Sequence, residues 1–358
     1  MIFQKKHTGF AIAIAWPETW CKQSGAWYDN FLNRLGISKN HYYKVGHAAL
    51  VLIDINTQKC HYFDFGRYHT PFNHGRVRSK MTDHGLKINI LAQISGDGQK
   101  IQNFEEILTE LQMNPECHGE GSIHASYGKI NISIAFAKVI RMQQISPIRY
   151  GPFRHNGSNC SRFVNTALRA GRPAWHSALK LNFLVPLTPT TLNNVNSFRN
   201  KIVLPKLLPF LAFKPVPIAD KSVLKTTLPT PLRPEGIPAT AQWLSGEGAG
   251  SWFNIIEKKN NRFFISRYSL LGGLECESEF IISNNQPFNI NNPYRFRYLS
   301  HCRKVKIRQN ENSIEFERLK KYDLSKNKYS DKSNTSIKSG KNKMNIWAPT
   351  QIMENIQN

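Results

Sequence analysis

The sequence has 358 residues, of which 40% are hydrophobic and 20% charged, a composition that excludes a disordered chain and allows two domains or one domain with an appendage. Its 48 lysines and arginines against 24 aspartates and glutamates give a formal net charge of +24, which favours acidic partners. Because no recognition motif for nucleic acid is present, we expect only weak contact with acidic partners through a solvated basic surface.

The six cysteines are scattered without a CxxC pair, which argues against a zinc ribbon and against a small disulfide framework. No stretch approaches the roughly 20 apolar residues of a membrane-spanning helix. The apolar run at 9–16 is followed by Pro17 and Glu18 rather than by the cleavage site of a signal peptide. We therefore expect a soluble, cytoplasmic protein with reduced thiols and no cofactor.

The first half of the chain alternates strand-like and helix-like segments. Two of the strand-like runs flank the polar residues 54–58 and predict a β-hairpin. Apolar side chains at helical spacing predict helices. The predicted strands are 9–16, 45–53, 59–66 and 87–94, and the predicted helices are 103–112, 132–144 and 160–170. Residues 1–185 are thus expected to form an α+β unit in which a largely antiparallel sheet packs against helices.

The second half reads as a connector, a small β domain and a tail. Prolines recur through residues 186–236, which predicts an extended connector. Residues 237–322 predict a small all-β domain, a β-meander, and residues 323–358 are rich in Lys, Ser and Asn, which predicts a basic, disordered tail. The predicted strands of the β domain are 252–258, 262–269, 274–282, 296–307 and 313–319.

The segment 157–171 predicts a helix with a cysteine on its first turn. Asn159 is a good N-cap, because its side-chain oxygen can accept a hydrogen bond from a free backbone N–H. Gly171 stands where a C′ glycine ends a helix, and Pro173 blocks continuation. Cys160 would then lie at the positive end of the helix dipole, which lowers the pKa of a thiol. This placement is typical of a cysteine nucleophile.

A cysteine nucleophile needs a base within hydrogen-bond reach and a third group that orients the base. His47 is the candidate base, since it is a polar residue in an apolar strand upstream of the cysteine helix. A buried histidine taken alone is more often structural. The helix that carries Cys160 is what favours a catalytic role for His47.

The third group should come from the returning strand of the hairpin. If residues 56–57 form the centre of the turn, Asp64 pairs with Ala49 and shares the face of His47. A one-residue shift in register would instead place His61 on that face. We prefer Asp64, because a carboxylate holds an imidazole in the useful tautomer, and we keep His61 as the alternative.

Three short motifs occur in a fixed order along the first unit. Residues 46–48 read Gly-His-Ala, residues 62–66 read Tyr-Phe-Asp-Phe-Gly, and residues 159–164 read Asn-Cys-Ser-Arg-Phe-Val. In this order they resemble the circularly permuted papain-like thiol enzymes. Lecithin retinol acyltransferase and its bacterial relatives belong to that superfamily, as do cell-wall peptide hydrolases. The resemblance covers roughly residues 40–175 and would make this chain part of an uncharacterised bacterial family.

The resemblance implies a permuted papain-like fold, with Cys160 as nucleophile, His47 as base and Asp64 or His61 as the third residue. It implies a hydrolase or acyltransferase that forms a thioester on an amide, ester or thioester substrate. Ser161 stands where an acidic residue is usual in lecithin retinol acyltransferase, so the substrate class stays open. The alternative is a catalytically inactive member of the fold that binds nucleic acid or an anionic lipid surface.

Supporting and peripheral roles are assigned to five further positions. The backbone N–H of Cys160 is expected to contribute to an oxyanion hole, with Asn159 and Ser161 in support. His69, His74 and Arg76 are candidates for the mouth of the site, where they could contact substrate. Cys117, His118, Glu120 and His124 are metal-ligand types at short spacing, but the glycines among them favour a loop, so we expect no metal site.

Overall fold

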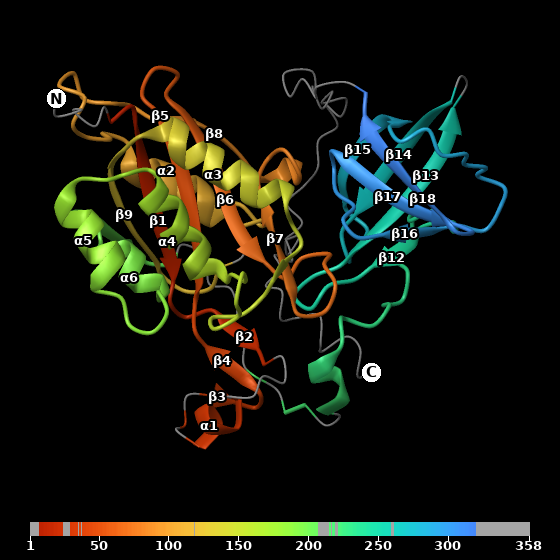
Figure 1. The fold of residues 1–358 in the computed structure, drawn as a ribbon, viewed down its shortest axis with the longest axis horizontal. Coiled ribbons are helices and arrows are strands. Elements are labelled where there is room, and N and C mark those ends of the chain that lie inside the picture. The colour runs from red at the N-terminus through yellow and green to blue at the C-terminus, as the bar shows by residue number, and fades with distance from the viewer. Residues whose placement is uncertain are drawn as a thin grey trace, which may run out of the picture.

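The computed structural model describes residues 7–23, 29–34, 36, 38–117, 119–206, 215, 217–218, 221–258 and 261–319. These residues form an α+β unit and, after it in the chain, a β-rich unit (Figure 1). No helix among them is long and apolar enough to cross a membrane. The predicted basic tail, 323–358, lies outside the described residues.

The first unit is built on one antiparallel sheet of eight strands. The strand order is β10-β7-β6-β5-β1-β9-β11, and β8 pairs with β6. The strands are β1 Gly9–Trp16, β5 His47–Asp54, β6 Lys59–Gly66, β7 His74–Arg78, β8 Lys87–Leu91, β9 Ile123–Ile130, β10 Ile148–Arg149 and β11 Asn200–Leu204. A smaller sheet joins β2 Trp20–Lys22, β4 Tyr42–Lys44 and β3 Ser38–Lys39.

Helices cover both faces of the large sheet, which explains why β1 and the interior of β5, residues 48–53, are apolar. On one face, side chains of α3, α4, α5 and α6 form a core with Ala13 and Leu50. On the other face, α2 packs against Ile12 and Val51. The helices are α1 Asp29–Arg34, α2 Phe104–Met113, α3 Ile132–Gln144, α4 Cys160–Ala170, α5 Trp175–Phe183 and α6 Thr191–Asn196, with short 3-10 turns at His84–Leu86 and Lys221–Lys225.

The second unit is a seven-stranded antiparallel sheet around an apolar core that includes Phe253, Phe263 and Phe316. Its strands are β12 Gln242–Leu244, β13 Ser251–Lys258, β14 Arg262–Tyr268, β15 Leu274–Ile282, β16 Arg295–Arg297, β17 Lys304–Gln309 and β18 Asn312–Arg318. The order is β12-β13-β14-β15-β18-β17-β16. The predicted meander therefore holds only as far as β15, because β18 and not β16 pairs with it.

Three other expectations need correction. The predicted connector contains α6 and β11, and β11 adds to the first sheet beside β9, so the first unit extends to Leu204. The predicted strand 296–307 is two strands, β16 and β17. The thiols are not all reduced, because Cys276 and Cys302 form a disulfide, with Cα atoms 6.0 Å apart.

Candidate active site

Cys160 is the first residue of α4, as predicted. The Asn159 side-chain oxygen accepts a hydrogen bond from the Arg162 backbone N–H at 2.8 Å, which confirms Asn159 as the N-cap. The helix ends differently from the expectation: Gly171 has φ −66°, and the positive φ of 50° falls on Arg172. A Cβ at Gly171 would lie 3.0 Å from Ile130, so close packing is what this glycine permits.

His47 is the first residue of β5 and lies directly opposite Trp16 on β1. The two rings stack, with centroids 5.8 Å apart and planes 24° apart. Gly46, just before it, has φ +74°, and a Cβ there would lie 2.9 Å from the Trp16 carbonyl oxygen. Glycine adopts a positive φ easily and has no Cβ that would collide with this carbonyl oxygen. Gly46 and Trp16 together therefore fix where the imidazole lies.

Cys160 and His47 shift each other's pKa. Burial disfavours the thiolate, but the neighbouring His47 imidazolium, with help from the Ser161 hydroxyl and the Ala48 backbone N–H, outweighs burial and lowers the pKa of Cys160. Burial also disfavours the imidazolium, but the interactions with Asp64 and Cys160 outweigh burial and raise the pKa of His47 to about 9. The ion-pair form, thiolate with imidazolium, is therefore favoured in the folded protein.

Asp64 also lies next to the imidazole. The β5–β6 register pairs Asp64 with Ala49, as the turn predicts. Its carboxylate oxygen Oδ2 is 3.5 Å from His47 Nε2, an ion-pair contact that is longer than a well-formed hydrogen bond. Nε2 is buried and has no hydrogen-bond partner of good geometry, so Asp64 is the group that faces it. The carboxylate is oriented to attract the imidazolium.

Arg78 holds Asp64 in the charged state. Its Nε and Nη2 donate to the two carboxylate oxygens at 2.9 and 2.5 Å, and the Tyr62 hydroxyl donates at 3.2 Å. Burial raises the pKa of this carboxyl, but Arg78 and His47 outweigh burial and lower it far below its ordinary value. The guanidinium also lies over the Tyr68 ring, 3.8 Å from its centroid. This shift favours the ionised form of Asp64 at neutral pH.

His61 is not part of this arrangement. It pairs with Leu52, one position out of phase with Asp64, so it faces the opposite side of the sheet. Its ring packs against Phe136, with centroids 5.3 Å apart, and burial, with help from neighbouring lysines, lowers its pKa to about 4. The structure brings Asp64 to His47 and leaves His61 apart.

Ser161 and His74 lie in less distinctive surroundings. The Ser161 hydroxyl is 3.9 Å from the Cys160 sulfur, and the Ser161 carbonyl accepts from Asn194. His74 is partly buried, with Nδ1 2.9 Å from the Phe72 carbonyl oxygen. Ser161 is thus next to the thiol, whereas His74 is bound to its own loop.

His69 and Arg76, expected at the mouth of the site, are instead buried between the two units. His69 Nε2 lies 2.8 Å from the Ser251 hydroxyl of the second unit. Arg76 donates to both oxygens of Asp83 at 2.7 Å, and Arg267 of the second unit donates to the same carboxylate at 2.9 Å. Neither side chain is free to contact substrate, because both are committed to this interface.

A second buried ion pair joins the units beside Cys21. Arg67 Nη1 lies 2.7 Å from Glu247, whose other oxygen accepts from the Asn73 backbone N–H. The Gly248 N–H donates to the Arg67 carbonyl at 2.9 Å. The second unit is therefore anchored on the loop that follows β6, the strand that carries Asp64.

Two members of the site were not predicted as such. The sequence analysis assigned no role to Trp16 or Arg78, and β7, which carries Arg78, was not among the predicted strands. The available signal was the spacing in β7: Arg76 and Arg78 alternate as strand residues do, and Arg78 pairs with Asp64. His118, one of the potential metal ligands in 117–124, lies outside the described residues. The other potential ligands of this segment form no cluster that could hold a metal ion. In the described part of the chain, the three side chains that do lie close enough together are His84, Cys276 and Cys302.

Residues 11–176 match the family described as type VI secretion system effector TseH-like. This segment contains Cys160, His47 and Asp64. Residues 241–319 match a second family, the DUF6695 C-terminal domain. A crystal structure of the type VI secretion system effector TseH is similar at 18% identity, covering 55% of this chain and 93% of that one, with a TM-score of 0.36. No curated protein matches this chain.

Proposed function

We propose that this chain is a cysteine-dependent hydrolase or acyltransferase, with a permuted papain-like fold in its first unit, that works through a thioester on Cys160. One observation carries the proposal: Cys160, His47 and Asp64 form a buried chain in which the pKa of the thiol is lowered and that of the imidazole is raised. The similarity of residues 11–176 to secretion effectors supports the further proposal that the enzyme acts as an effector.

The reaction begins from the ion pair. The Cys160 proton resides on His47, and the thiolate attacks the carbonyl carbon of an amide, ester or thioester. The backbone N–H of Cys160, at the start of α4, donates to the oxyanion that forms. His47 then gives its proton to the leaving amine, alcohol or thiol as the C–N, C–O or C–S bond breaks, which leaves the acyl group on Cys160.

Release of the acyl group reverses the proton movement. His47 takes a proton from water or another acceptor, which attacks the thioester, and the Cys160 sulfur leaves as the thiolate. Asp64 stays ionised throughout and stabilises each imidazolium. Water as acceptor makes the enzyme a hydrolase, and an alcohol or amine acceptor makes it an acyltransferase.

The test is labelling of the full chain with a thiol-reactive acyl probe. Wild type should be labelled on Cys160 at neutral pH, and Cys160→Ala should not be labelled. Cys117→Ala is the matched control, because Cys117 is also buried but burial raises the pKa of its thiol well above the ordinary value. Labelling that moves to another cysteine in Cys160→Ala would contradict the assignment.

Turnover separates this proposal from the alternative of an inactive binding module. Cell-wall peptides, simple esters and acyl thioesters are offered to wild type and to Cys160→Ala. Hydrolysis or transfer by wild type alone supports the proposal. Salt-sensitive binding of nucleic acid or anionic vesicles that is equal in both proteins, with no turnover, would favour the binding module instead.

A further inference from the structure

Helix α5 carries its largest apolar side chains on the face turned away from the protein. Trp175, Leu179 and Phe183 follow one another at intervals of four residues, so they form a stripe along one side of the helix, which we call the α5 patch. Ser177 and Leu181, the buried residues of α5, lie on the opposite side, and Leu181 belongs to the apolar core. Trp175 is 79% exposed and Phe183 is 76% exposed. The helix is thus apolar towards solvent as well as towards the core.

The exposed apolar residues continue beyond the end of α5. Leu184 is 62% exposed and Leu187, in the loop that leads to α6, is 96% exposed. Single exposed apolar residues are normal on a protein surface, but several together mark a site of interaction. Figure 1 shows α5 on the side of the first unit that faces away from the second unit, so the second unit does not cover this surface.

The part of the chain around the α5 patch is basic and contains no acidic residue. Residues 121–206 include α5 and the two helices that it packs against, α4 and α6. They contain twelve lysines and arginines and no aspartate or glutamate. The second unit differs, because residues 237–319 contain eight glutamates among their basic residues. The surface that α4, α5 and α6 build therefore presents positive charge without acidic side chains of its own.

Three of these cations lie beside α5. Lys180 is on α5, and its Nζ donates to the Asn196 backbone carbonyl of α6 at 3.3 Å. Lys201 Nζ donates to the Asn196 side-chain oxygen at 2.8 Å, so two ammonium groups meet at one residue. Slight burial and the charges of Arg199 and Lys180 lower the pKa of His176, the neighbour of Trp175, which places Arg199 close by as well. Within the described part of the chain, no carboxylate lies at ion-pair distance from these three cations.

We propose that the α5 patch docks this protein on an anionic lipid bilayer, with the apolar stripe below the headgroups and Lys180, Arg199 and Lys201 against the headgroup phosphates. Interfacial helices have this composition, with Trp, Phe and Leu on one face and basic residues beside them. A second copy of the chain fits less well, because it would bring two cationic surfaces together. A nucleic acid would satisfy the charges but would leave the leucines in water.

The test is sedimentation of the full chain with vesicles of equal parts phosphatidylglycerol and phosphatidylcholine. Wild type should bind them, less so at high salt, and should bind vesicles of phosphatidylcholine alone much more weakly. Trp175→Ala/Phe183→Ala should bind at least about tenfold more weakly, since the burial of two large apolar side chains is lost. The control Leu271→Ala/Leu274→Ala removes two exposed apolar side chains of the second unit and should bind like wild type. Equal losses in the two double variants would contradict the location.

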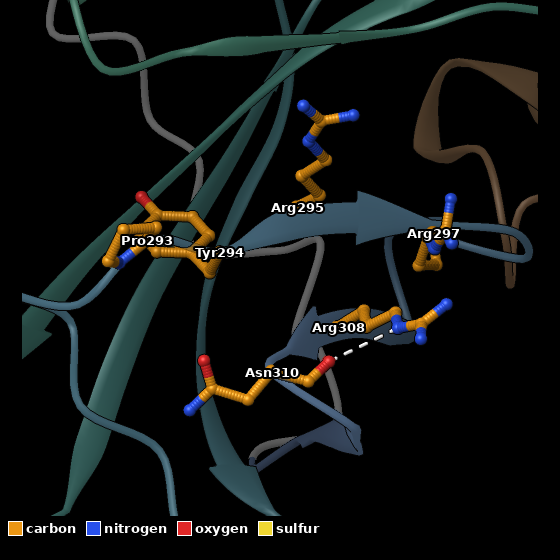
Figure 2. Close-up of a pocket in the computed structure, with 6 residues that line it drawn as sticks. All are labelled: Pro293, Tyr294, Arg295, Arg297, Arg308 and Asn310. Carbon is orange, nitrogen blue, oxygen red and sulfur yellow. Dashed lines mark hydrogen bonds between the residues drawn. The ribbon is translucent and has the colours of Figure 1, made fainter.

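A second pair of variants tests the charges. Lys180→Gln/Lys201→Gln should bind at least about fivefold more weakly, because each basic residue near an anionic surface contributes about that much. Arg295→Gln/Arg297→Gln is the matched control: both arginines are exposed on the second unit (Figure 2), and their loss lowers the net charge of the chain equally. The control should bind like wild type. If it weakens binding as much, total charge rather than the α5 surface drives the interaction, and the proposal is wrong.

Fluorescence reports whether Trp175 enters the bilayer. Lipids with brominated acyl chains quench a tryptophan that lies among them, so wild type should be quenched on binding. Trp175→Phe keeps an apolar ring and should still bind, but most of the quenching should be lost. Unchanged quenching in this variant would show that another tryptophan enters the bilayer and would refute the orientation.

Two other occupants are outcomes of the same experiments. Tighter binding of a thymidine oligonucleotide than of vesicles, lost in Trp175→Ala/Phe183→Ala, would replace the proposal by a nucleic-acid site. A dimer that this variant abolishes, without vesicle binding by wild type, would replace it by contact between two copies. Labelling of Cys160 should be the same in every variant, and Cys160→Ala should bind vesicles like wild type. Failure of docking and failure of the proposed reaction are therefore distinguishable.

Discussion

His47 Nε2 lies 3.5 Å from the Asp64 carboxylate, and the same carboxylate is held by Arg78 in the interior of the first unit. One buried negative charge thus serves two cations, an arginine that is always charged and a histidine that titrates. Because the always-charged Arg78 contributes most to keeping Asp64 ionised, the carboxylate can attract the imidazolium at every step of a reaction without taking its proton.

Removal of the Asp64 charge should weaken the interaction that stabilises the His47 imidazolium. Asp64→Asn leaves Arg78 buried without its partner, which should cost about 3–5 kcal/mol of folding free energy. It should also lower the pKa of His47 from about 9, because the charge interaction with Asp64 is lost. We expect slower alkylation of Cys160 at neutral pH, measured with iodoacetamide, and a lower urea midpoint.

Asp54→Asn is the control for this change. Asp54 ends β5 on the same hairpin, is partly exposed, and accepts a hydrogen bond from the Asn56 backbone N–H. Its loss should leave the alkylation rate unchanged. Equal alkylation rates for wild type and Asp64→Asn would contradict the role given to Asp64.

The opposite pKa shifts of Cys160 and His47 predict a distinct pH dependence. Because the pKa of Cys160 is lowered, its alkylation at pH 7 should be faster than that of N-acetylcysteine. Turnover needs the imidazolium as an acid, so it should decline as pH rises through about 9, whereas alkylation should not. Rates of both processes measured across this range provide the check.

The stability of the folded protein should depend on pH through the titration of His47. The pKa of His47 is raised from 6.5 to about 9 on folding, so its contribution to stability is fully present below pH 6.5 and is lost as pH rises through about 9. His47→Gln should remove this dependence. Urea unfolding of both proteins at pH 6 and pH 10 tests the sign, and a wild type that gains relative stability at alkaline pH would contradict it.

Gly46→Ala should displace the imidazole. A Cβ at this positive-φ position costs about 1–2 kcal/mol and also meets the Trp16 carbonyl oxygen at 2.9 Å and the Pro17 Cα at 3.0 Å. Gly98→Ala is the control, since Gly98 has φ +64° with no atom near its Cβ position. Both variants should lose stability, but only Gly46→Ala should lose Cys160 labelling; full labelling of Gly46→Ala would show that the position of His47 tolerates the change.

Glu247→Gln should weaken the contact between the units. It leaves Arg67 buried with an uncharged partner, and breaking a buried ion pair costs about 3–5 kcal/mol. Glu279→Gln breaks an exposed pair with Arg262 and should cost at most about 1 kcal/mol. Urea unfolding measures both, and limited proteolysis between residues 205 and 236 reports separation of the units. Equal midpoints for the two variants would refute the importance of the Arg67 contact.

Local patterns in the sequence predicted the elements that carry the chemistry. The bounds of β1 and α3 agree with the predicted ranges, since a continuous apolar run and a helical period are strong signals. The Asn159 cap and the pairing of Asp64 with Ala49 also followed from local chemistry. These features depend on residues that are close in the chain, so an isolated sequence can reveal them.

The missed features depend on partners that are distant in the chain. The β9 sequence, with Ser126 and Gly128 in its middle, has weak strand character, and its position beside β1 is what orders it. His69 and Arg76 looked like loop residues because the second unit that buries them begins well over 150 residues later. The Cys276–Cys302 disulfide joins residues 26 positions apart, without a spacing motif.

The buried charges between the units limit how this protein can be rearranged by recombination. The two family matches fall on separate segments, 11–176 and 241–319, which gives the chain the look of two interchangeable modules. Yet, among the residues that the structure describes, the carboxylate that pairs with Arg67 is that of Glu247, and Arg267 of the second segment pairs with Asp83 of the first. A hybrid that grafted an unrelated second segment onto the first would inherit an arginine without its counter-charge. We therefore expect the two segments to be inherited together, each with the partner segment that supplies its counter-charges.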